Sequence, residues 1–221
     1  MTPEQAGTGW TLIVPVKATS RGKSRIALAP ADRRRVARAL ALDTVTAAAA
    51  ARTVTTLVVI VENEPDGALL SQVAGVRVRL TAATSLNEAI TDGLDGVSGL
   101  VAVLPGDLPG VRGSDIDAAL ALAVAGWASE SAPMAVVADR QGVGSTLLAG
   151  VDPASLRPRY GPDSYRRHLA AGALALEVPP DNWIRRDVDT AEDLAEITTG
   201  RTGVLVAELS MSARACVEQA C

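Results

Sequence analysis

The sequence predicts a single α/β domain whose central sheet is mostly parallel and carries helices on both faces. Two observations lead to this fold class. Short apolar runs alternate with helical segments, which is typical of βαβ units. The run VTTLVVIV at 54–61 is nearly continuous in β-branched residues, as expected of a strand covered on both faces. With 221 residues, 48% of them hydrophobic, the chain can bury the core that this fold needs.

The first two thirds of the chain follow a regular alternation. We expect strands at 11–16, 54–61, 76–80, 100–104 and 134–138, separated by helices at 31–51, 65–74, 87–97 and 115–125. Pro30 stands directly before the first of these helices, where its fixed φ favours a helix start.

The alternation becomes less regular after residue 139. We expect a turn at 141–144, strands at 145–149, 174–178 and 184–188, a helix at 163–171 and a helix that begins at Thr190. Residues 1–10 are expected to form a flexible N-terminus, 11–199 the domain, and 200–221 a C-terminal tail that is either helical or disordered. Cys216 and Cys221 lie within this tail and predict neither a disulfide framework nor a metal cluster.

Composition excludes several classes of partner. A formal net charge of −4 argues against broad electrostatic binding to nucleic acid. No apolar stretch reaches the roughly 18–20 uncharged residues that span a bilayer. The start of the chain, MTPEQAGTGW, lacks the basic and apolar regions of a signal peptide. We therefore expect a cytoplasmic protein with no nucleic-acid or membrane partner.

The scarcity of histidine and cysteine narrows the chemistry further. His168 is the one histidine, and both cysteines lie in the tail, so Ser–His, Cys–His and zinc sites are disfavoured. We expect His168 at the surface or beside a bound phosphate rather than in a catalytic role. The sequence also contains no G-x-x-x-x-G-K-[ST] loop and no G-x-G-x-x-G after the first strand, which disfavours P-loop NTPases and dinucleotide-dependent oxidoreductases.

Two acidic positions follow predicted strands. Asp107 comes just after the strand at 100–104, and the Asp187-Val188-Asp189 segment follows a short apolar stretch far downstream. In an open α/β sheet, ligands bind in the crevice outside the carboxyl ends of the strands. Two carboxylates that reach one crevice form a site for a hard cation such as Mg²⁺.

Basic and glycine-rich segments add candidate sites for anions. The window 17–38 holds eight basic residues and one acid, and its first part, from Lys17 to Arg25, is expected to form an anion-binding loop. The turn Gly142-Val143-Gly144 with Ser145-Thr146 could offer amide and hydroxyl donors. The Gly161-Pro162-Asp163-Ser164 segment opens a helix, whose N-terminus binds phosphate readily. Acids, basic groups and glycine loops without histidine are the groups needed for phosphoryl or nucleotidyl transfer.

Several of these motifs occur together in one known family. They are VPVKATSRGKSRIA (14–27), SLNEAI (85–90), LPGDLPG (104–110), DRQGVGSTLL (139–148), RYGPDSYRRH (159–168) and RRDVDTAEDL (185–194). In this order they resemble the phosphoenolpyruvate or 2-phospho-L-lactate guanylyltransferases of coenzyme F(420) biosynthesis. The resemblance covers roughly residues 11–197. It implies a Rossmann-like, GT-A-type nucleotidyltransferase domain.

The resemblance also implies a reaction and its residues. The phosphate of a three-carbon phospho-acid attacks the α-phosphorus of GTP and pyrophosphate leaves. Asp107 and Asp187 would hold Mg²⁺, while Lys17, Lys23 and Arg25 would face the triphosphate. The nucleoside would lie against four residues, Leu86, Asn87, Pro105 and Gly106. The phospho-acid would contact Thr146, Gly161 and Ser164.

Some alternatives stay open from the sequence. Asp189 is either a further acid beside the metal site or a helix cap. Phosphoenolpyruvate is the expected acceptor because the Ala- and Arg-rich, Lys-poor composition is typical of a high-GC bacterium; 2-phospho-L-lactate, 3-phosphoglycerate or a sugar phosphate are the alternatives. A nucleotide-binding regulator without catalytic activity is the rival from another class.

Overall fold

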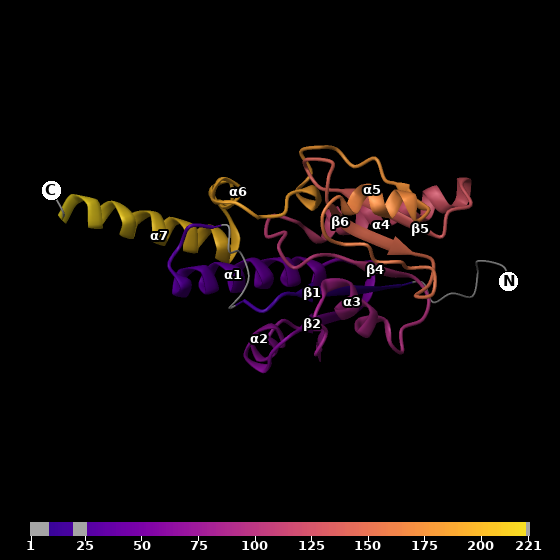
Figure 1. The fold of residues 1–221 in the computed structure, drawn as a ribbon, viewed down its shortest axis with the longest axis horizontal. Coiled ribbons are helices and arrows are strands. Elements are labelled where there is room, and N and C mark those ends of the chain that lie inside the picture. Colours follow the sequence, from indigo (N-terminus) through magenta and orange to yellow (C-terminus); the bar gives the residue numbers. More distant parts are fainter. Residues whose placement is uncertain (1–8, 20–25, 220–221) are drawn as a thin grey trace.

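The described residues form one seven-stranded sheet covered by helices (Figure 1). The computed structural model describes residues 9–19 and 26–219, with the side chains of 213–219 excepted. The strands are β1 (Trp10–Val16), β2 (Val54–Val61), β3 (Val76–Leu80), β4 (Val101–Val103), β5 (Met134–Ala138), β6 (Ser145–Gly150) and β7 (Ala173–Ala175). Their order across the sheet is β3-β2-β1-β4-β6-β5-β7.

Strand directions make the sheet mixed but mostly parallel, which confirms the predicted fold class. β1 pairs in parallel with β2 and β4, β2 with β3, and β5 with β7. Only β6, among the described strands, runs antiparallel to its neighbours β4 and β5. As a result, the start of β6 lies at the same edge of the sheet as the carboxyl ends of β1, β2, β4 and β5.

Helices cover both faces of the sheet. They are α1 (Pro30–Ala49), α2 (Glu64–Leu70), α3 (Leu86–Leu94), α4 (Gly113–Ser129), α5 (Ser164–Ala170), α6 (Ala191–Ala195) and α7 (Gly200–Gln219). Apolar residues of α1, α2 and α4 pack with one face of β1 and β2. Residues of α3, together with Tyr160 and Tyr165, pack with the other face. The core therefore has one layer on each face of the sheet, and a third apolar cluster joins α1 to α6 and α7. No helix of the described chain is long and apolar enough to cross a bilayer.

Most predicted elements agree with the structure to within a few residues, and one is wrong. The stretch 184–188 was predicted to be a strand, but Trp183–Arg185 forms a 3₁₀ turn (η2) and the chain then continues without regular structure. Arg185 explains the difference. Its guanidinium donates to the carbonyl oxygens of Ala138, Asp139 and Val178, which holds the backbone against the end of β5.

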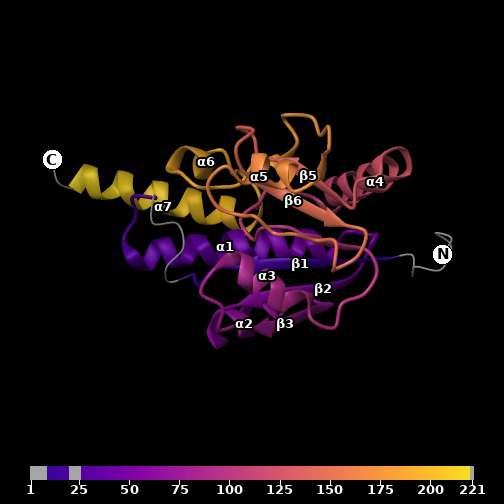
Figure 2. The same cartoon turned by 45° about the vertical axis from the view of Figure 1, so that its right-hand side comes forward.

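The C-terminal segment is a helix that is anchored to α1. Figure 2 shows α7 beside α1 and extending beyond it. The buried carboxylate of Asp43, on α1, accepts hydrogen bonds from the amides of Arg201 (3.1 Å) and Thr202 (2.8 Å) at the start of α7. Gly200 has φ +70°, and a Cβ there would lie 2.6 Å from Asp43 Oδ2. The side chain of Cys216, residue Cys221 and most of the predicted N-terminal segment lie outside the described residues.

Candidate active site

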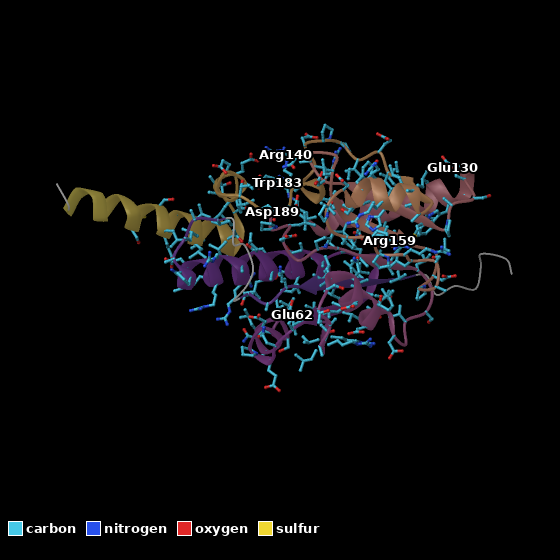
Figure 3. All side chains as sticks on the ribbon, in the orientation of Figure 1. Glu62, Glu130, Arg140, Arg159, Trp183 and Asp189 are labelled. Carbon is cyan, nitrogen blue, oxygen red and sulfur yellow. The ribbon has the colours of Figure 1, made fainter. Side chains whose placement is uncertain are left out.

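A cleft of about 650 Å³ opens at the carboxyl edge of β1, β2 and β4. Figure 3 shows Glu62 and Asp189 near the middle of the view, at the end of the sheet that faces α7, and Glu130 far to the right. The lining comes from the ends of the three strands, the start of α3 and the face of α1. It includes Lys17, Glu62, Leu86, Pro105, Gly106, Asp107 and Asp189. The cleft therefore lies where an open α/β sheet is expected to bind its ligand.

Asp107 is held at this edge by its neighbours in the chain. Gly106 lies so close to β1 that a Cβ there would be 2.8 Å from Val16 Cγ2 and 3.2 Å from the carbonyl oxygen of Pro15. The amide of Leu108 donates to the hydroxyl of Thr44 on α1 (3.0 Å). Because the residues on both sides of Asp107 are fixed, its carboxylate has a defined place in the cleft.

The structure brings Asp187 next to Asp107, as the sequence predicted. The amide of Val188 donates to the carbonyl oxygen of Asp107 at 3.1 Å. Burial, reinforced by the negative charges of Asp107, Asp189 and Asp139, raises the pKa of Asp187 to about 7. Asp107, Asp139 and Asp189 thus lie close enough for their charges to act on Asp187, and this repulsion favours a positively charged ligand.

Asp189 is not a helix cap. The N-cap of α6 is Thr190, whose hydroxyl accepts from the amide of Asp193, and Asp193 in turn accepts from the amides of Thr190 and Asp189. This capping box confirms the predicted helix start. It also fixes the backbone of Asp189, whose side chain lines the cleft. The structure therefore excludes the helix cap, one of the two predicted alternatives for Asp189. It leaves the other, a further acid beside the expected metal site.

The pair Asp107 and Asp187 fits a hard cation that is shared with a ligand. Both are carboxylates, and Mg²⁺ is commonly bound by one or two carboxylates plus substrate phosphates and water. Across the described residues, no group of three or more His, Cys, Asp or Glu is arranged to enclose a metal ion by itself. The donor set therefore suits an ion that arrives together with phosphate oxygens.

The segment that leaves β1 is anchored by a residue that sequence reasoning missed. Both the amide and the hydroxyl of Thr19 donate to the buried carboxylate of Asp66, at 3.0 and 2.8 Å. Burial would raise the pKa of Asp66, but the hydrogen bonds from Thr19 and Asn63 and the charge of Arg38 hold it below its ordinary value. Asp66 follows a typical helix start, Asn63-Glu64-Pro65, so nothing in the sequence linked it to Thr19.

Lys17 belongs to the predicted anion-binding loop. It lines the cleft, and its side chain is exposed. Lys23 and Arg25 lie outside the described residues. Of the predicted nucleoside contacts, Leu86, Pro105 and Gly106 line the cleft as well.

Asn87 is placed differently from these residues. Its amide group bonds both main-chain groups of Tyr160: Nδ2 donates to the carbonyl oxygen (3.2 Å), and Oδ1 accepts from the amide (2.9 Å). Asn87 therefore joins α3 to the segment before Gly161.

Thr146 and Ser164 lie on the other side of the sheet edge. Val103 pairs with Leu148, so Thr146 lies at the level of Pro105 just beyond β4. The register between β5 and β6 shifts here: Val137 pairs with Leu147 and Ala138 with Ser145, which leaves Thr146 as the extra residue. Its hydroxyl is buried and has no hydrogen-bond partner within the described part of the protein. Such shifts often direct a side chain into a site.

One predicted set of anion donors is wrong. The carboxylate of Asp139 accepts from the amides of Val143 (2.9 Å) and Gly144 (2.6 Å), so this turn is closed on itself rather than open to a ligand. The hydroxyl of Ser145 is bonded to His168. Of the groups predicted there, the hydroxyl of Thr146 is left for an anion.

The predicted surface position of His168 is also wrong. Its side chain is 0% exposed. Nδ1 lies 2.9 Å from the hydroxyl of Ser145, Nε2 accepts from the amide of Arg159 at 2.8 Å, and the ring packs edge-on against Tyr160. Burial, followed by the charges of Arg167 and Arg159, lowers the pKa of His168 to about 4. A neutral imidazole with both nitrogens engaged cannot act as a general base for a substrate.

Comparison with known proteins agrees with this architecture. The family described as "Guanylyl transferase CofC like" matches residues 10–216. Phosphoenolpyruvate guanylyltransferase of Salinispora arenicola is 40% identical over 193 residues, which cover 85% of this chain and 86% of the relative. The enzyme of the same name from Thermomonospora curvata is 35% identical over 215 residues, or 95% and 92% of the two chains.

Solved structures with low sequence identity share the fold. A nucleotidyl transferase from a Methanothermobacter species has a TM-score of 0.60 at 16% identity, covering 86% of this chain and 95% of that one. A cytidylyltransferase from Leptospira borgpetersenii has a TM-score of 0.55 at 13% identity, covering 93% and 94%. The fold is thus that of nucleotidyltransferases, and the chain belongs to the CofC-like guanylyl transferase family.

Proposed function

We propose that this protein transfers GMP from GTP to the phosphate of phosphoenolpyruvate, in the biosynthesis of coenzyme F(420). The observation that carries the proposal is the convergence of Asp107 and Asp187 beside a cleft large enough for a nucleotide. The printed names of the relatives favour phosphoenolpyruvate as the acceptor over 2-phospho-L-lactate, 3-phosphoglycerate or a sugar phosphate. Catalytic function is favoured over a purely regulatory role for the same reason.

In the proposed reaction an oxygen of the acceptor phosphate attacks the α-phosphorus of GTP. A new P–O bond forms there, the bond from the α-phosphorus to the α,β-bridging oxygen breaks, and pyrophosphate leaves. The products are enolpyruvyl-diphospho-guanosine and pyrophosphate. An acceptor phosphate is already ionised near neutral pH, its second pKa being about 6, so the step needs no general base. The burial of His168 is consistent with that.

The proposed role of each charged residue follows from its position in the site. Asp107 and Asp187 would hold Mg²⁺, which when bound neutralises negative charge between nucleotide and acceptor. Lys17 would face the triphosphate from the end of β1. Two phosphate charges about 3.5 Å apart, one of them a dianion, repel by on the order of 10 kcal/mol at an effective dielectric of about 20, so this neutralisation is essential.

The nucleoside and the acceptor would occupy opposite sides of the acids. Leu86, Pro105 and Gly106 would contact the nucleoside in the cleft at the carboxyl ends of β1, β2 and β4. Thr146, with Ser164 and Gly161 near it, would bind the phospho-acid. The buried hydroxyl of Thr146 supports this assignment because a buried hydroxyl without a partner is costly unless a ligand completes it.

A substrate panel tests the proposal. Purified protein is incubated with GTP plus each of phosphoenolpyruvate, 2-phospho-L-lactate and 3-phosphoglycerate, with and without Mg²⁺, and separately with CTP, a sugar phosphate and Mg²⁺. Pyrophosphate and product mass are measured. We expect product only when Mg²⁺ is present, and most with phosphoenolpyruvate. Product from CTP and a sugar phosphate, with none from GTP and any of the three acids, would disprove it. Binding of GTP without turnover of any acceptor would favour the regulatory role instead.

A further inference from the structure

An unusual group of buried polar side chains lies beside the expected acceptor site. Of the ten polar or charged side chains that are buried in the described chain, four belong to this group: Ser145, Thr146, Ser164 and His168. None of the last three is more than 3% exposed. Buried polar groups cost free energy unless they are satisfied by hydrogen bonds, so their concentration at one place calls for a functional explanation.

His168 connects three separate segments within this group. Nδ1 contacts the hydroxyl of Ser145 at the start of β6, and Nε2 accepts from the amide of Arg159 in the segment before Gly161. The hydroxyl of Ser164, at the start of α5, donates to Ser145 at 3.4 Å. These segments are the ones that carry Thr146, Gly161 and Ser164.

The protonation of His168 follows from its partners. Nε2 accepts a main-chain N–H and therefore carries no proton, so in the neutral ring the proton is on Nδ1 and is donated to Ser145. Ser145 thus has one oxygen lone pair occupied by His168. Its own proton is then available for Ser164.

We propose that His168 is a positioning residue for the acceptor: through Ser145 it frees the hydroxyl of Ser164 to donate to the anionic group of the phospho-acid. Without ligand, Ser164 donates to Ser145. When an anion accepts a hydrogen bond from the hydroxyl of Ser164, the bond between the two hydroxyls reverses and Ser145 donates to Ser164. This works because Nδ1–H continues to satisfy Ser145. The inference rests on the proposed function, which assigns Ser164 to the acceptor.

The second bond of His168 serves the same subsite. The amide of Arg159 is held by Nε2, and the next residue, Tyr160, is held at both main-chain groups by Asn87. Gly161 follows with φ +115°, a conformation that favours glycine. The backbone that leads to Gly161 is therefore held in place by two side chains, His168 and Asn87, that do not themselves need to contact the acceptor.

Two substitutions separate the two bonds of His168. In His168→Gln the side-chain oxygen reaches the place of Nε2 and can accept from Arg159, but the donor to Ser145 is lost. In His168→Asn the amide nitrogen lies near the place of Nδ1 and can donate to Ser145, but the acceptor for Arg159 is lost. Ser145→Ala removes the relay by deleting a single hydroxyl, so it retains the fold even if the His168 variants do not.

The experiment measures KM for phosphoenolpyruvate and for GTP separately, with kcat, in all variants. We expect His168→Gln and Ser145→Ala to raise KM for phosphoenolpyruvate at least tenfold while KM for GTP changes less than twofold. His168→Asn, which retains a donor to Ser145 but loses the bond to Arg159, is expected to raise KM for phosphoenolpyruvate less than His168→Gln does. The double variant Ser145→Ala/His168→Gln is expected to be no worse than either single variant, since both break one relay.

A matched control distinguishes positioning from loss of stability. Leu156→Ala removes a buried side chain from the same core layer as Tyr160 without touching the relay, and it should lower Tm while leaving both KM values unchanged. Parallel changes in both KM values, or an unchanged KM for phosphoenolpyruvate in Ser145→Ala, would overturn the inference and leave the proposed function intact. If wild-type protein neither binds nor converts any of the three phospho-acids, the proposed function fails, and the inference fails with it.

Discussion

The main-chain amide of Val188 donates a 3.1 Å hydrogen bond to the carbonyl oxygen of Asp107. The bond joins two residues that are 81 positions apart in the sequence and brings Asp187 beside Asp107. Because it uses only main-chain atoms, it persists when either carboxylate is replaced. Substitutions of the two acids can therefore test their chemistry without removing the contact that aligns them.

Asp107→Asn is expected to abolish most of the transferase activity. An amide keeps the size of the side chain but removes the charge that attracts a cation. We expect kcat/KM to fall by at least about 10²–10³, in the range found when one electrostatic contact to a transition state is removed. Pyrophosphate release with GTP and phosphoenolpyruvate measures this. Asp181→Asn, at an exposed position, is the matched control and should retain wild-type activity. Equal activity in the two variants would contradict a role for Asp107.

Asp187→Asn is expected to stabilise the protein in the absence of metal. The pKa of Asp187 is raised to about 7 by burial and by Asp107, so the stability that its protonated form provides at low pH is lost as pH rises from about 4 to 7. At about pH 8 the variant should exceed wild type by on the order of 1–2 kcal/mol, a value reduced for solvent screening. Thermal unfolding with EDTA measures this difference.

The same unfolding experiment includes a metal control. Adding Mg²⁺ should raise Tm of the wild-type protein at about pH 8, because the cation offsets the repulsion among the carboxylates. It should have much less effect on Asp187→Asn. A variant that is less stable than wild type in EDTA at this pH would contradict the repulsion that we infer between Asp187 and Asp107.

Asp66→Asn is expected to weaken the binding of GTP more than that of the acceptor. Asp66 accepts both hydrogen bonds of Thr19, two residues after Lys17, and an amide in its place can accept with only one of its two atoms. Stability should fall by about 1–3 kcal/mol, and KM for GTP should rise several-fold with KM for phosphoenolpyruvate unchanged. Denaturant unfolding and steady-state kinetics measure the two effects.

Thr19→Ser serves as the control for Asp66→Asn. It retains the hydroxyl and the amide that bond Asp66, and it should leave KM for GTP near the wild-type value. If Asp66→Asn lowers stability but leaves KM for GTP unchanged, then Asp66 supports the fold alone.

Acid should destabilise the protein through His168. Its pKa is about 4 in the folded state and about 6.5 in an unfolded chain. Between these values the unfolded chain binds a proton that the folded protein does not, so the free energy of unfolding falls as pH decreases through this window. The loss is about 2 kcal/mol between about pH 7.5 and about pH 5.

Urea unfolding of wild type and His168→Asn over this range isolates that effect. Asp187 titrates in part of the same window with the opposite sign, but it is present in both proteins and cancels in the comparison. The variant should lose less stability than wild type between the two pH values. Identical slopes would show that His168 is not held neutral in the folded protein.

Periodic segments were predicted well from the sequence. The runs 54–61 and 134–138 are strands with the predicted bounds, because apolar residues mark a covered strand from end to end. The run 76–80 also has the predicted bounds, because its apolar and basic residues alternate as in a partly exposed strand. The acidic pair was also predicted, since Asp107 follows a strand that is buried and central. The order of strands across the sheet, and hence the neighbours of β6, depends on pairing that the residues of one strand do not reveal.

The errors share a physical cause, which is contact between residues distant in the sequence. Ile184 and Val188 are apolar and suggested a strand, but Arg185 bonds three carbonyl groups of other segments and bends the chain. His168 lies among arginines and suggested a surface helix, yet its partners Ser145 and Arg159 bury it. A helix of seven residues is too short for its pattern to show which side is buried.

The bond from Asp43 to the start of α7 has a consequence for folding. Its donors, Arg201 and Thr202, lie almost 160 residues further along the chain, so a very long loop must close before Asp43 is satisfied. During synthesis on the ribosome, α1 can form early, but the surface that α7 covers stays open until α7 itself has emerged. Docking of α7 is therefore a late step. The intermediate before it exposes the carboxylate of Asp43, which is buried in the folded protein, and apolar surface of α1 to other chains.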